Sequence, residues 1–195
     1  MRRSEWIVGG ILGLVVVAVV IGLLASWLNS RPKEEVISLN NLEYVTALEA
    51  YELAQPIAQK WSSDAALLSA SAGWQPETDF THGRASWTLV FYSQSQAATA
   101  LISVTNANAR LVRTTPQFEN FQPGDVSNWQ IDSPAAIAQL LNIGADDFMT
   151  LHAKVNLILT LDVKGTPTWR STFLDTVTKE TYSLNITANT GEFTQ

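Results

Sequence analysis

The N-terminal part of the chain contains a long run without a charged residue, from Trp6 to Leu28. As a helix, these 23 residues would be about 34 Å long, enough to cross a hydrocarbon core of about 30 Å. In lipid, an isolated segment must bond all of its own backbone N–H and C=O groups, which a helix does and a single strand cannot. We therefore expect residues 1–30 to form a transmembrane helix, with Trp6 and Trp27 at the two headgroup levels.

The same run argues against a secretory signal that is cleaved. Cleaved signals have an apolar stretch of about 7–15 residues and a small-x-small exit, but this stretch is longer, and its best site, after Ala25, has Leu23 at a position that needs a small residue. We expect an uncleaved signal anchor in the cell membrane, in contact with lipid. Gly9 and Gly13 have the spacing that lets two such helices approach closely, so a homodimer through the transmembrane helix is a further hypothesis.

Positive charge flanks the run on both sides, with Arg2 and Arg3 before it and Arg31 and Lys33 after it. The terminal amine adds to the charge before the run, which favours an N-terminus inside the cell and an extracytoplasmic domain. Residues 31–195 hold 12 − 2 = 10 Lys and Arg and 18 − 1 = 17 Asp and Glu, a net charge of −7, without a basic cluster. This charge argues against nucleic acid as a partner, and the absence of cysteine excludes disulfides and thiolate chemistry.

Apolar periodicity divides the rest of the chain into a juxtamembrane linker, residues 31–42, and two similar units, residues 43–113 and 131–195, joined by a second linker at 114–130. The first unit begins with an amphipathic helix over 43–61, which Pro56 is expected to kink or to divide into two turns. The second begins with a short helix capped at Asp132. Three strand-like runs follow each helix, at 65–74, 84–93 and 98–113 in the first unit and at 151–161, 168–176 and 181–188 in the second.

The two units match each other without a gap when the sequence is shifted by 82 residues. The shift superposes the large side chains of two runs, Trp87 on Trp169, Phe91 on Phe173, Ile102 on Leu184, Val104 on Ile186 and Leu111 on Phe193. The helices match at a shift of 80, with Ile57-Ala58-Gln59 on Ile137-Ala138-Gln139. We therefore predict an internal duplication and an α+β fold, in which the transmembrane helix precedes two α-β-β-β repeats, each an antiparallel sheet with a packed helix. The expected repeat core is Trp87, Phe91, Val104, Trp169, Phe173 and Ile186.

A strand with the pattern W-x-x-x-F and a last strand that ends in I-T-A-N-T-G-E-F resemble the PepSY domain of peptidase propeptides and of membrane-anchored bacterial proteins. The resemblance rests on the second unit, through Trp169, Phe173, Ile186, Ala188, Thr190, Gly191, Glu192 and Phe193. In the first unit, Ala109 and Arg110 stand where the pattern has Gly-Glu. The resemblance implies a tandem of PepSY/cystatin-like sheets and a role in restraining a protease.

Few residues have the chemistry of a catalytic or metal site. His82 lies in a loop with Glu77 and Asp79, which could meet a cation, but a transition-metal site normally needs more His or Cys ligands. His152 falls on the polar face of an expected strand, and we interpret both histidines as surface residues. No nucleophile motif, phosphate loop or dinucleotide fingerprint is present. The sequence therefore predicts no enzymatic activity, no catalytic residue, no metal site and no cofactor.

Three hypotheses for function remain open. The first is a membrane-anchored, extracytoplasmic, non-catalytic module that binds a protein or peptide through a free sheet edge or the groove between the units, and that regulates a protease as the PepSY resemblance implies. Trp74 and Trp129, at strand and linker edges, are its candidate partner contacts. The second is a small-ligand-binding or enzymatic domain with a cystatin-like pocket between helix and sheet. The third is a structural component of a membrane complex.

Overall fold

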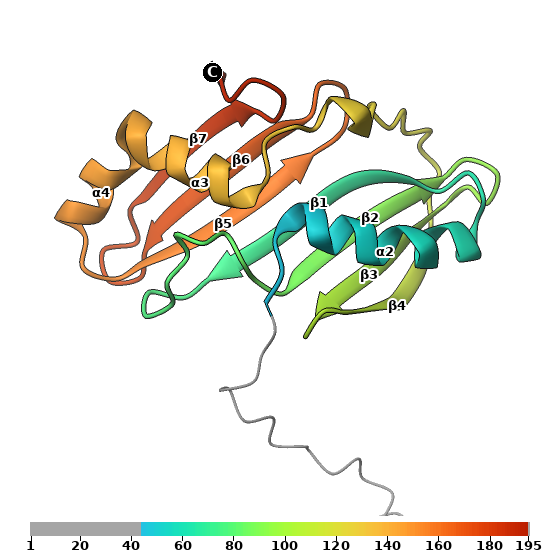
Figure 1. The fold of residues 1–195 in the computed structure, drawn as a ribbon, viewed down its shortest axis with the longest axis horizontal. Helices are drawn as coiled ribbons and strands as arrows, with labels where there is room; N and C mark the ends of the chain where they lie inside the picture. Colours follow the sequence, from blue (N-terminus) through green and yellow to red (C-terminus); the bar gives the residue numbers. More distant parts are fainter. Residues whose placement is uncertain (1–43, 195) are drawn as a thin grey trace, which may run out of the picture. The chain divides into compact units, whose positions relative to one another are not determined.

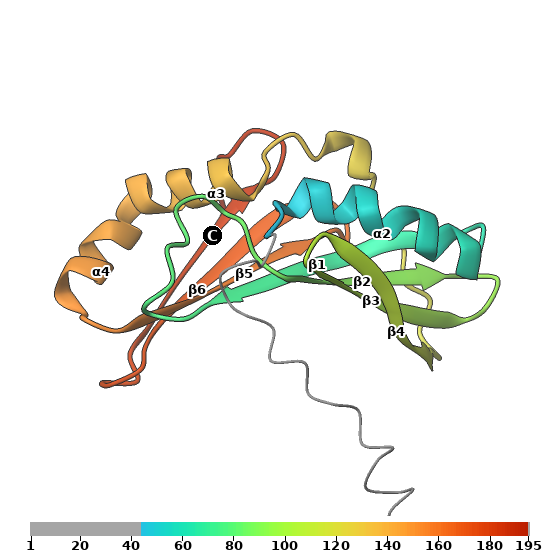
Figure 2. The same cartoon turned by 60° about the horizontal axis from the view of Figure 1, so that its bottom comes forward.

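A single antiparallel sheet of eight strands forms the frame of the computed structural model, which describes residues 44–194 (Figure 1). The strand order is β4-β3-β2-β1-β5-β6-β7-β8, so each half is a meander of four consecutive strands, and the halves join at β1 and β5. The helices lie on one face of this sheet (Figure 2), with α2 over the strands of the first half and α3 and α4 over those of the second.

The first half consists of α2 (Ala47–Trp61), β1 (Ala66–Trp74), β2 (Trp87–Ser93), β3 (Ala98–Thr105) and β4 (Asn108–Pro116). The second half consists of a 3₁₀ turn η2 (Val126–Asn128), α3 (Ser133–Leu140), a π-helical turn η3 (Leu141–Ala145), α4 (Asp146–Leu151), β5 (Val155–Asp162), β6 (Thr168–Asp175), β7 (Thr181–Thr187) and β8 (Phe193–Thr194).

The predicted fold class, two α-β-β-β repeats with separate PepSY/cystatin-like sheets, is wrong. The sequence predicts one strand-like run over 98–113, but Asn106 and Ala107 adopt φ angles of 52° and 54° and turn the chain back on itself, which creates β4. Strands β1 and β5 then pair with each other from Ser69–Asp162 to Trp74–Leu157. Two separate sheets would leave both of these strand edges unpaired, and joining them satisfies their backbone groups.

Strand register nevertheless relates the two halves. Trp87 pairs with Val104 across β2 and β3, and Trp169 pairs with Ile186 across β6 and β7, so both pairs have the same spacing in sequence. All six residues of the expected repeat core are at most 1% exposed: Trp87, Phe91, Val104, Trp169, Phe173 and Ile186. The shift of 82 residues therefore describes the second and third strands of each half correctly.

Outside those strands the shift fails. Ile186 pairs with Phe193, whereas Val104 pairs with Ala109, so Phe193 corresponds to Ala109 and not to Leu111. The cause is the last turn of each half, which has two residues in the first half and four in the second, where the Thr187 N–H donates to the Glu192 carbonyl at 2.8 Å.

The expected helix match, at a shift of 80, is also wrong. Thr46 caps α2 and Asp132 caps α3, which gives a shift of 86. The same shift superposes the buried positions of the two helices, Ala47 on Ser133, Ala50 on Ala136 and Ala54 on Leu140. Alanine-rich amphipathic helices resemble each other at several registers, so the caps and the buried face are better guides than short identities.

Pro56 does not divide α2, which runs unbroken from Ala47 to Trp61. Pro56 and Glu52 both face solvent, so water can reach the Glu52 carbonyl, which the proline deprives of its helical donor. Within residues 44–194 no helix is long and apolar enough to cross a membrane. The predicted transmembrane helix, with Trp6, Gly9, Gly13 and Trp27, lies outside the described residues.

Candidate binding surface

Among residues 44–194, strand β4 is the free edge of the sheet in the first half, and it is nine residues long. Every residue of β4 except Ala109 is exposed, including Leu111 at 40% and Val112 at 50%. The opposite edge, β8, has two residues. A long exposed edge strand is a template on which another strand can form, so β4 is the first candidate for a binding surface.

The directions of the backbone groups of β4 follow from the bond that closes the β3–β4 ladder. The Gln117 N–H donates to the Ala97 carbonyl at 2.8 Å. Because bonded and non-bonded pairs alternate in an antiparallel ladder, the odd-numbered residues of β3 bond to β4 and the even-numbered ones to β2. The β4 partners of the even-numbered residues therefore point their backbone groups to the free edge: Ala109, Leu111, Thr114 and Pro116. The proline has no N–H to leave unpaired, as is usual for proline at a sheet edge.

The two faces of β4 differ in chemistry. Leu111 pairs with the buried Ile102 and so points to the face that carries the helices. Arg110 pairs with Ser103, and Arg113 pairs with Leu101 beyond a bulge at Val112, so both arginines point to the opposite, open face. The edge therefore presents an apolar residue on one side and two cations on the other.

Arg110 and Arg113 also differ from the other two arginines of residues 44–194. Arg84 pairs with Glu49 at 2.9 Å, and Arg170 pairs with Asp162 at 3.2 Å. Neither β4 arginine forms an ion pair with any other residue in that range. This is notable because the same residues hold 8 Lys and Arg against 14 Asp and Glu, a net charge of −6.

Helix α2 adds an apolar flank beside β4. Its buried alanines face the sheet, and Tyr51 on one side of them packs against Phe91 and Trp129, toward the centre of the molecule. At 100° per residue, Leu53 and Ile57 lie on the other side, toward β3 and β4, which α2 contacts most. Leu53 is 38% exposed, similar to Leu111.

Trp74 and Trp129, the expected partner contacts, are core residues instead. They are 3% and 7% exposed, and each indole N–H donates to a backbone carbonyl, of Arg84 at 3.1 Å and of Ile131 at 2.8 Å. Both rings belong to a continuous aromatic series in the order Phe91, Tyr51, Trp129, Trp169, Trp87 and Trp74. The tryptophans therefore join the two halves internally and offer no contact surface.

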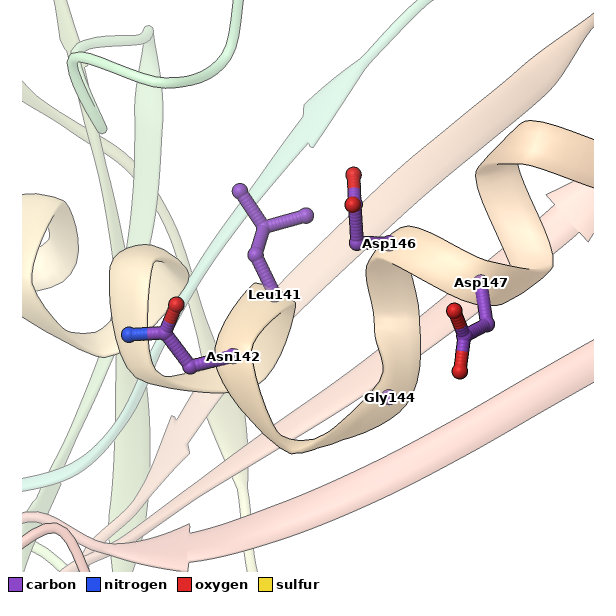
Figure 3. Close-up of a pocket in the computed structure, with 5 residues that line it drawn as sticks. All are labelled: Leu141, Asn142, Gly144, Asp146 and Asp147. Carbon is purple, nitrogen blue, oxygen red and sulfur yellow. The ribbon is translucent and has the colours of Figure 1, made fainter.

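An open hollow of about 450 Å³ lies on the helical segment of the second half, lined by Leu141, Asn142, Gly144, Asp146 and Asp147 (Figure 3). Gly144 has a φ of 131°, and a Cβ there would lie 2.9 Å from the Tyr182 hydroxyl. Figure 3 shows the carboxylates of Asp146 and Asp147 pointing away from each other, so they do not share a ligand. Within residues 44–194, no three His, Asp or Glu side chains are grouped closely enough to hold a metal ion.

His152 is more enclosed than its sequence pattern predicts. Its side chain is 13% exposed and lies between two carboxylates, with Nδ1 2.7 Å from Asp175 Oδ2 and Nε2 3.3 Å from Glu180 Oε2. The imidazole stacks on Phe148, with ring centroids 4.1 Å apart. The expectation of a surface histidine on a strand is wrong because α4 extends to Leu151 and brings His152 over the end of β6. The sequence carries no local signal for this contact, because Asp175 is 23 residues from His152 along the chain.

The buried Asp175 accepts the Val177 N–H at 2.6 Å, and this bond, with those from His152 and Thr178, holds the pKa of its carboxyl below the usual range despite burial. The position equivalent to Asp175 in the first half, at the shift of 82, is Ser93. There the hydroxyls of Ser62 and Ser93 and the Ser95 amide bond to Asp64 and lower the pKa of its carboxyl. Both clusters tie the helix-to-strand connection to the end of a neighbouring strand, which is a structural role.

His82, the other histidine, lies 3.6 Å from Asp79, and both side chains are largely exposed.

Comparison of the chain with protein-family models, with curated proteins and with solved structures found no match. The resemblance to PepSY domains therefore stays a prediction, and function has to be argued from the surface itself.

Proposed function

We propose that this protein is a non-catalytic binding module that captures an extended segment of a partner protein by strand addition to β4. The observation that carries the proposal is the nine-residue edge with outward backbone groups at Ala109, Leu111 and Thr114. Such an edge gives affinity through main-chain hydrogen bonds and selects side chains through the flanking surfaces.

The other surfaces of the described residues support this choice over an enzyme or a ligand-binding domain. The hollow beside Gly144 is open and mostly polar. Sites for small molecules are usually concave and mostly apolar, with a few polar groups that point to a common centre. The hydrogen bonds of His152 and Asp175 join the segment before β5 to the end of β6, which is a structural role. The membrane location and the regulation of a protease, both predicted from the sequence, stay predictions.

The test uses the full 195-residue chain in a non-ionic detergent and a fluorescein-labelled seven-residue peptide in which glutamine alternates with valine. Fluorescence anisotropy measures binding, and hydrogen–deuterium exchange of residues 108–116 locates it. We expect a dissociation constant below about 1 mM and slower exchange in β4. The same peptide with an N-methyl group on every residue should not bind, because neither of its edges can then donate the N–H bonds that complete the ladder.

A matched pair of variants distinguishes backbone pairing from side-chain contact. Leu111→Pro removes one outward N–H without removing a bond to β3, and Leu111→Thr keeps that N–H on a strand-forming residue. Loss of about one hydrogen bond predicts roughly tenfold weaker binding for the proline variant alone. Equal binding by the two variants, or binding without protection of β4, would refute strand addition.

A further inference from the structure

The two faces of β4 define which extended segments fit it. A strand added at the free edge has side chains that alternate between the faces, in step with those of β4. Residues of the partner opposite Ala109 and Leu111 point to the helix side, and the residue opposite Arg110 points to the open face. Recognition is therefore periodic in the partner sequence, with a repeat of two residues.

Acidic side chains fit the open face. Directly opposed side chains on neighbouring strands have Cβ atoms about 5 Å apart, which is within reach of an ion pair. Arg110 and Arg113 stand two register positions apart on that face, because the bulge at Val112 adds one residue between them. With no carboxylate of residues 44–194 paired to either arginine, an acidic partner would supply the missing counter-charges.

Apolar side chains fit the helix side. There Leu111 and Leu53 are each exposed by more than a third, and Ile57 lies on the same flank of α2. A branched apolar residue opposite Leu111 would remove part of this surface from water. The helix side of β4 carries no charged residue: its side chains are those of Ala109, Leu111, Thr114 and Pro116.

We infer that β4 selects extended segments in which acidic residues alternate with apolar ones, with the acidic side chains on Arg110 and Arg113. This inference rests on the proposed strand addition but adds a sequence preference to it. The domain as a whole is acidic and would repel such a segment, so the preference belongs to β4 and not to overall charge.

The test compares labelled seven-residue peptides on the full chain in detergent, with valine alternating with glutamate, glutamine or lysine. Two cross-strand pairs at about threefold each predict binding of the glutamate peptide about tenfold tighter than that of the glutamine peptide, and weakest binding of the lysine peptide. The advantage of glutamate should shrink in high salt, because the pairs are exposed. A glutamate and valine peptide of the same composition but in two blocks should lose most of this affinity.

Charge reversal assigns the preference to the two arginines. In the double variant Arg110→Glu/Arg113→Glu, the lysine peptide should bind better than the glutamate peptide. Lys154→Glu/Lys179→Glu changes the net charge by the same amount in the second half and should keep the order of the original chain. Circular dichroism checks that both variants are folded.

The outcomes separate the two proposals. Equal affinity for all three peptides with protection of β4 would overturn the acidic preference and leave strand addition standing. A glutamate preference that survives the Arg110→Glu/Arg113→Glu change would also overturn the inference, because a surface other than β4 would then bind the glutamate side chains. If no peptide binds or protects β4 at 1 mM or below, about the limit set above, both proposals fail together.

Discussion

At the scale of single residues, the buried carboxylate of Asp175 is a source of pH dependence. Its pKa is lowered chiefly by the Val177 N–H and further by His152 and Thr178, so the folded state favours the ionised form. A lowered folded-state pKa gives stability that is present above the unfolded value of about 3.9 and is lost as the pH falls below it. We predict that urea unfolding of the protein shows falling stability from about pH 5 downwards.

The variant Asp175→Asn isolates this contribution. It should be less stable than the original chain at pH 7 and less sensitive to pH between about 5 and 2, since the amide does not titrate. Asp147→Asn, at an exposed position without these bonds, is the matched control and should leave the curve unchanged. Parallel curves for Asp175→Asn and the original chain would show that Asp175 does not contribute to the pH dependence.

Some of these residues could be predicted from the sequence and some could not. Trp87 and Trp169 are evident because large side chains at a constant shift indicate a shared core position. The enclosure of His152 is not evident, because it depends on Asp175, which approaches only after two strands have paired. Arg110 and Arg113 are visible as cations in an acidic domain, but nothing local indicates that they stand on an edge strand.

At the scale of elements, Asp132 links the starts of two helices. Its Oδ1 accepts the Ser133 N–H of α3 at 2.7 Å and the Leu48 N–H of α2 at 3.0 Å, close to the positive ends of both helix dipoles. One cap contributes about 1 kcal/mol, so Asp132→Ala should lower the free energy of unfolding by about 2 kcal/mol and Thr46→Ala by about 1. Urea denaturation measures both. Asp132→Asn keeps a side-chain oxygen that accepts these bonds. Its free energy of unfolding should therefore lie between that of Asp132→Ala and that of the original chain.

Pro56 gives a prediction of opposite sign. Because α2 continues through it on the exposed side, Pro56→Ala restores a donor for the Glu52 carbonyl and removes the ring without opening a cavity. We expect the unfolding free energy to rise by about 1–3 kcal/mol. Gln59→Ala, at another exposed position of α2, should change it by less than about 0.5 kcal/mol. A loss of stability in Pro56→Ala would mean that the ring makes a contact that stabilises α2.

Elements are also where the sequence prediction of the fold succeeds and fails. Capping at Asp132 and alternation along β5 are local patterns, and the structure has a helix that starts at Ser133 after this cap and a strand in the alternating run. The strand begins at Val155, four residues later than expected, because α4 occupies the chain up to Leu151. The β3–β4 turn is missed because Ala107 adopts a left-handed conformation that residues with a Cβ rarely take. One unpredicted turn changes the strand count of the first half from three to four and moves the free edge to β4.

At the scale of the whole molecule, each half completes the other. The pair Ser71–Thr160, whose hydroxyl oxygens are 2.9 Å apart, lies in the middle of the β1–β5 ladder, about which the two meanders are arranged. A half alone would expose one of these central edges and would also lose both aromatic contacts between the halves, Tyr51–Trp129 and Trp87–Trp169. A unit of about 75 residues is marginal even with an intact core, so neither half should be stable alone.

We therefore predict that fragments 1–122 and 123–195, cut in the connection between β4 and η2, are each without cooperative unfolding, and that mixing them restores it. Near-ultraviolet circular dichroism of the tryptophans should appear on mixing and saturate at a ratio of one to one, because the indoles come from both fragments. The variant Thr160→Pro in fragment 123–195 should prevent reassembly by removing a central ladder position. The matched control, Thr181→Pro near the sheet margin, lies three strands from β1 and should still reassemble. If either fragment melted cooperatively by itself, the halves would be independent domains and the β1–β5 ladder a secondary contact between them.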